Sequence, residues 1–68
     1  MRYAVVIERA ENHLSAYVPD LPGCVATGET IEEVEHEIRE AILFHLDGLQ
    51  VDSLPIPTPT TICRYVEV

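Results

Sequence analysis

Hydrophobic and polar residues alternate along the first third of the chain in the manner of short β-strands. In residues 3–8 apolar side chains occupy both faces, which is typical of a strand inside a sheet. Residues 9–12 are polar and fit a hairpin turn, and alternation resumes over residues 13–18. Two prolines and a glycine then end the second strand. Residues 24–27 predict a third, short strand, which Gly28 closes.

Residues 30–49 have the period of an amphipathic helix. Thr30 and Glu33 match a capping box, in which the threonine hydroxyl accepts a hydrogen bond from an otherwise unpaired backbone N–H. The apolar face of this helix consists of Ile31, Val34, Ile38, Ala41, Ile42, His45 and Leu49. Leu43 projects nearly opposite that face, and with Phe44 and Leu46 it makes the second half of the helix apolar almost all round. Such a helix is buried on more than one side, which predicts an oligomer or partner surface here.

The remainder of the chain predicts a return to the sheet. Three alternating prolines make residues 53–61 an extended polyproline segment, and residues 62–68 are β-branched and aromatic, as expected of a last strand. The predicted fold is therefore a single α+β domain over residues 1–68, in the order β-β-β-α-β, with one helix packed on one face of the sheet. A right-handed crossover places the last strand beside the first and parallel to it, in the spatial order 3-2-1-4.

The charge balance narrows the choice of partner. Twelve Asp and Glu residues stand against four Arg and no Lys, so the formal net charge is −8. Direct binding to nucleic acid or to an anionic membrane is disfavoured, because both depend on Lys and Arg. A basic protein would be attracted instead. No secretory signal or long apolar span is present, so we expect a cytoplasmic protein in which Cys24 and Cys63 are free thiols.

Catalytic, metal and cofactor sites are not expected. The histidines and cysteines lack the spacing of a zinc site, and isolated glycines make no phosphate-binding loop. The element order is that of part of the ribonuclease H fold, but its chemistry needs converging carboxylates, and here most acids crowd residues 29–40 of the helix. A thiol nucleophile at Cys24 beside His13 is conceivable, although a cysteine at this position is more often a small core residue.

One continuous stretch resembles a known family. Residues 17–24, with the sequence YVPDLPGC, are followed by TGET at 27–30 and by two glutamates that open the helix. This pattern is similar to the signature of HicB-like antitoxin domains, and the similarity extends over nearly the whole chain. The family motif residues in this sequence are Pro19, Asp20, Leu21, Pro22, Gly23, Cys24, Gly28 and Thr30. The resemblance implies a partial ribonuclease H-like fold without nuclease activity.

The resemblance also implies a function and a partner. HicB-like antitoxins bind and occlude small basic ribonuclease toxins of the HicA type, and they typically dimerise. Candidate contact residues for a toxin or a second copy are Leu43, Phe44, Leu46, Leu21 and Glu29. Many members carry a C-terminal DNA-binding segment; this chain stops at Val68, so a short form without that segment is expected.

Two alternatives remain open at this point. One is a stand-alone oligomeric interaction domain without a toxin. The other is a small ligand-binding domain that uses His13, Tyr17, Asp20 and Cys24.

Overall fold

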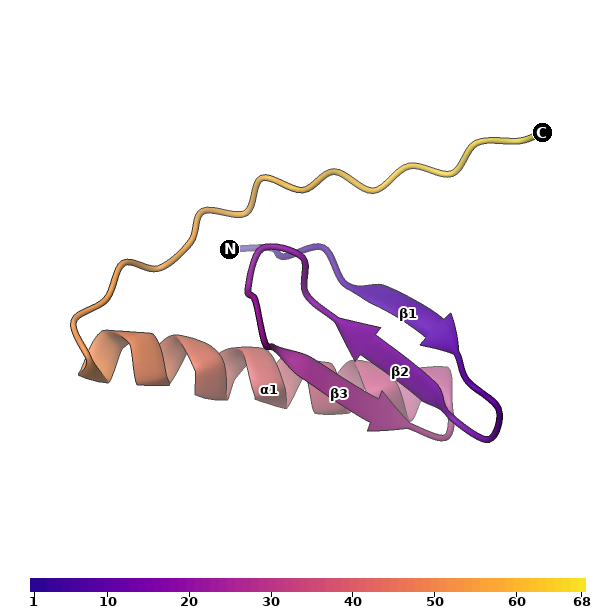
Figure 1. The fold of residues 1–68 in the computed structure, drawn as a ribbon, viewed down its shortest axis with the longest axis horizontal. Coiled ribbons are helices and arrows are strands. Elements are labelled where there is room, and N and C mark those ends of the chain that lie inside the picture. Colours follow the sequence, from indigo (N-terminus) through magenta and orange to yellow (C-terminus); the bar gives the residue numbers. More distant parts are fainter.

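A three-stranded antiparallel sheet is covered on one face by a long helix in the computed structural model, which describes all 68 residues (Figure 1). The elements are β1 (Val6–Arg9), β2 (Leu14–Tyr17), β3 (Val25–Gly28) and α1 (Ile31–Val51). β2 lies in the middle of the sheet, so β1 and β3 both have an unpaired outer edge. The α+β class and the order of the first four elements are confirmed. α1 lacks the sustained apolarity that crossing a bilayer requires.

The predicted fourth strand is not formed within the single chain. Residues 62–68 are extended but unpaired, so the spatial order 3-2-1-4 is wrong in its last position and β1 stays at the edge. The physical reason lies just before this segment: the backbone N–H groups of Thr60 and Thr61 donate to the side chain of Asp20 instead of to a neighbouring strand. In Figure 1 the end of the chain runs beyond the sheet as a separate extended segment.

The hydrophobic core lies between β2, the loop that follows it and the first half of α1. Its seven buried side chains are those of Leu14, Ala16, Val18, Leu21, Cys24, Val34 and Ile38. α1 packs on β2 and β3 but not on β1. Gly28 permits the close packing of β3 on α1, because a Cβ atom there would lie 2.7 Å from the backbone nitrogen of Val34.

The predicted start of the helix is confirmed at Thr30. This residue has extended backbone angles, and its hydroxyl oxygen accepts a hydrogen bond of 3.0 Å from the backbone N–H of Glu33. Glu32 and Glu33 lie in the first turn, where negative charge is favoured by the helix dipole. The helix continues to Val51, two residues beyond the range predicted from its apolar period.

Candidate protein-binding surface

The loop between β2 and β3 builds the core. Three backbone hydrogen bonds close it: the N–H of Val18 donates to the carbonyl of Cys24 (3.2 Å), Leu21 donates to Val18 (3.0 Å), and Cys24 donates to Leu21 (3.0 Å). Gly23 has a φ of +85°, which favours glycine. The side chain of Leu21 is fully buried, with 0% exposed. Leu21 therefore exposes no surface in this structure, and its predicted contact with a partner has no support from the fold.

Asp20, in the same loop, holds the chain that follows the helix. One carboxylate oxygen accepts bonds from the backbone N–H groups of Thr60 (3.0 Å) and Thr61 (3.1 Å), and the other accepts from their hydroxyls at 3.2 and 2.9 Å. These bonds, led by the backbone N–H of Thr61, lower the pKa of the Asp20 carboxyl. A second anchor lies nearby, where the hydroxyl of Tyr3 donates to the carbonyl of Pro57 at 2.6 Å.

The role of Thr60 and Thr61 was missed in the sequence, where both residues looked like part of a linker. The only signal was the pair of adjacent threonines itself, whose hydroxyls and N–H groups match the acceptors of one carboxylate. Since 40 residues separate Asp20 from Thr60, no local pattern predicts their contact. Asp20 is consequently a structural anchor rather than a free charge.

An open groove lies between α1 and β3, which is an edge strand of the sheet. We call this the α1–β3 groove; its lining residues are Val25, Ala26, Thr27, Glu37, Glu40, Ala41, Leu43, Phe44 and Asp47. Phe44 is 82% exposed and Leu43 is 53% exposed. Three carboxylates and no basic residue belong to the lining. The groove thus combines apolar contact area with negative charge beside an unpaired strand edge.

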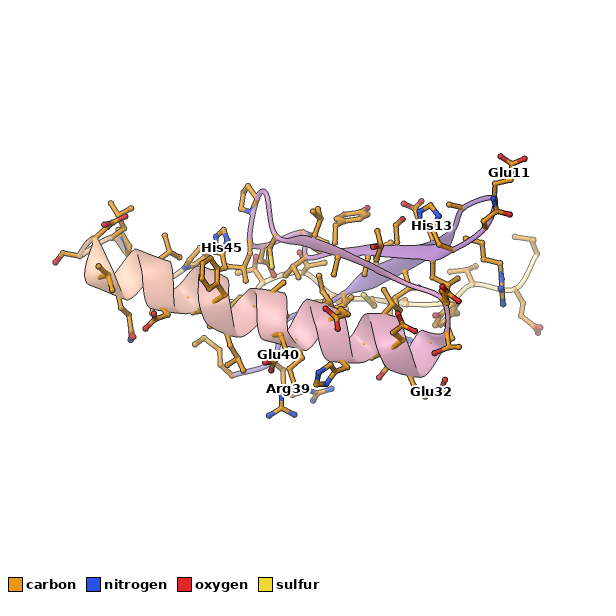
Figure 2. The ribbon with its side chains drawn as sticks, turned by 90° about the horizontal axis from the view of Figure 1, so that it is seen from below. Glu11, His13, Glu32, Arg39, Glu40 and His45 are labelled. Atoms are coloured by element: carbon orange, nitrogen blue, oxygen red, sulfur yellow. The ribbon has the colours of Figure 1, made fainter.

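The other two candidate contact residues lie outside this groove. Leu46 is half-buried and packs against the core. Glu29 is exposed and lines a separate pocket at the β1–β2 turn, together with His13. On the helix, Glu32 and Arg39 point away from the sheet, whereas His45 lies on the side of the sheet (Figure 2).

The residues considered for a ligand site do not come together. The strand register pairs Leu14 with Gly28 and Tyr17 with Val25, so His13 and Cys24 lie at opposite ends of the sheet. Cys24 is buried, which raises the pKa of its thiol. No group of three or more His, Cys, Asp or Glu side chains is placed to hold a metal ion. The geometry gives the ligand-binding alternative no support.

Comparison with known proteins decides the family. A family model described as "HicB_like antitoxin of bacterial toxin-antitoxin system" matches residues 3–68. The chain belongs to the HicB-like antitoxin family. This HicB-like chain is 34% identical over 61 residues to a protein named Antitoxin HicB 2 from Photorhabdus laumondii, and the match covers 90% of the chain. It is 35% identical over 66 residues to an uncharacterised protein of Haemophilus phage HP1, which covers 97% of the chain.

A solved structure agrees with the sequence comparison. The HicB-like chain superposes with a TM-score of 0.76 on a chain of a structure described as a HicA3 and HicB3 toxin-antitoxin complex, at 27% identity and over 88% of its own length. It spans 70% of that chain, 50% of the phage protein and 44% of the Photorhabdus antitoxin. The family assignment from sequence and the fold of the solved structure therefore agree.

Proposed function

We propose that this HicB-like chain neutralises a small basic ribonuclease toxin of the HicA type by occluding its surface, without catalysis of its own. The observation that carries the proposal is the α1–β3 groove, which presents apolar side chains beside carboxylates at an open strand edge. The related chain from a toxin-antitoxin complex supports the same class of partner. The two requirements of such a surface, attraction and anchoring, are met by different residues.

Attraction comes from the charge. The chain carries a formal net charge of −8, and Glu37, Glu40 and Asp47 concentrate part of it along the groove. Complementary charge raises the rate at which a basic partner associates and excludes acidic competitors. This contribution is screened by salt, because the Debye length falls from about 10 Å at 0.1 M to about 3 Å at 1 M.

Anchoring comes from Phe44 and Leu43. An aromatic side chain that is 82% exposed in the free domain has most of its surface available to bury against a partner. Aromatic residues at the centre of an interface commonly cost about 2 kcal/mol or more when truncated, which corresponds to roughly thirtyfold in affinity. The unpaired edge of β3 beside them allows a partner strand to extend the sheet.

The test is binding of this chain to a small basic ribonuclease of the HicA type, measured by calorimetry, together with rescue of the growth arrest that this ribonuclease causes. We expect Phe44→Ala to weaken binding by roughly thirtyfold and to abolish rescue. Val51→Ala is the matched control, because Val51 is 75% exposed on the same helix but does not line the groove. Failure of the unmodified chain to bind, or equal affinities for the two variants, would overturn the proposal.

A further inference from the structure

The last seven residues of the chain have the composition of a strand and no partner. The exposed fractions of Ile62, Tyr65, Val66 and Val68 are between 80% and 123%. No backbone hydrogen bond joins residues 62–68 to the rest of the chain. Such a segment presents unpaired N–H and C=O groups together with apolar side chains, which is a template for pairing with another strand.

β1 also lacks a neighbouring strand on one side, as residues 62–68 do. Its outer edge is unpaired, and α1 does not pack on it. Around its inner face lies a second groove, lined by Met1, Tyr3, Val5, Ile7, Glu35, Ile38, Arg39 and Ile42. The apolar side chains of Tyr3, Val5 and Ile7 are only partly buried against the core. An added strand at the outer edge of β1 would supply hydrogen-bond partners for its backbone, and the apolar side chains of residues 62–68 would bury more of this face.

Residues 62–68 do not pair with the outer edge of β1 in the same chain. Asp20 anchors Thr60 and Thr61, and residues 61–63 lie beside residues 2–4 with an open pocket between them. Beyond that point the segment continues past the sheet without pairing (Figure 1). We propose that residues 62–68 add as a strand to β1 of a second copy, and that the second copy returns its own segment in a two-fold dimer.

The exposed area of the chain fits a dimer of standard size. A compact monomer of 7.6 kDa exposes about 4,300 Å², whereas this chain exposes 5536 Å². The excess of about 1,200 Å² is more than the roughly 800 Å² that each partner buries in a typical stable interface. The radius of gyration of 13.0 Å likewise exceeds the value of about 11 Å for a compact domain of this length.

Charge favours a second copy over a basic toxin at this surface. The segment carries Arg64 and Glu67, and β1 carries Glu8 and Arg9, so both elements hold one charge of each sign. A balanced, largely apolar pair of strands suits a self-complementary interface. The α1–β3 groove lies at the opposite edge of the sheet and stays free in such a dimer. The inference is therefore independent of the proposed toxin.

The first experiment is the molar mass of the full chain by light scattering across micromolar concentrations. We expect a dimer, and we expect Val66→Pro to raise its dissociation constant by at least about tenfold, because proline removes a backbone donor and fits poorly in a paired strand. Helix content should persist, since Val66 contributes nothing to the core. Thr58→Pro is the control, because Thr58 already lies in an extended proline-rich segment, and it should remain dimeric.

The second experiment locates the contact. A chain with a nitroxide on the exposed Cys63 is mixed with an isotope-labelled chain that carries Cys63→Ser, and attenuation of amide signals is measured. If residues 62–68 of one chain pair with β1 of the other, the nitroxide should strongly attenuate the amide signals of β1 in the isotope-labelled chain. A monomer throughout the concentration range, a dimer insensitive to Val66→Pro, or a dimer without attenuation in β1 would each overturn the proposal.

Discussion

Adding one methyl group at Gly28 should destabilise the domain, whereas the same change at Gly48 should not. A Cβ at Gly28 would lie 2.7 Å from the nitrogen, 2.9 Å from the Cα and 3.1 Å from the Cβ of Val34. Two of these atoms belong to the backbone of the first helical turn, and Val34 is fully buried. The clash can be relieved only if α1 moves away from β3, which opens the core.

The magnitude follows from the size of the domain. Overpacking a core contact costs about 1–3 kcal/mol, and a chain of this length has a total stability of about 3–10 kcal/mol. A loss near 2 kcal/mol lowers the Tm of such a small domain by about 8–16 °C. At Gly48 no atom lies within 4 Å of the added Cβ. Alanine there should raise stability by up to about 1 kcal/mol, through its higher helix propensity.

Thermal unfolding followed by far-ultraviolet circular dichroism measures both effects. All variants must be compared at one protein concentration, because association would make the Tm depend on concentration. The reasoning is refuted if Gly28→Ala unfolds within about 2 °C of the unmodified chain, or if both variants shift by the same amount. Either result would mean that the approach of β3 to α1 adjusts without cost.

Two further predictions concern the Asp20 carboxylate and the two cysteine thiols. Hydrogen bonds lower the pKa of the Asp20 carboxyl below its ordinary value of 3.8, so the stabilisation from this anchor should be complete above pH 3.8 and be lost as the pH falls through the lowered pKa of the folded state. The amide signals of Thr60 and Thr61 in an NMR spectrum should shift over that acidic range. An unchanged spectrum would contradict the anchor. Ellman's reagent should modify the exposed Cys63 rapidly and the buried Cys24 only as the domain unfolds, so two fast thiols would argue against the core.

Local physical chemistry made much of this protein predictable from its sequence. Alternation with a period of two predicted that β1 and β2 exist, although β1 spans Val6–Arg9 rather than the predicted residues 3–8. Thr30 marked the start of α1. Both signals depend on neighbours a few residues apart. The loop sequence at residues 19–24 indicated the family for a related reason. Its two prolines restrict the backbone angles, and Gly23 has a φ of +85°, which few other residues adopt, so this short sequence specifies the conformation of the loop.

Only the tertiary structure decided which of these residues are buried and which are exposed. Leu21 was a candidate contact residue but fills the core, and Asp20 was a candidate ligand-binding residue but binds Thr60 and Thr61. Residues 62–68 have the β-branched and aromatic composition of a strand, but they are not paired with any strand of the same chain. A side chain's propensity is a property of its own sequence neighbourhood, whereas burial and strand pairing depend on contacts between residues far apart along the chain.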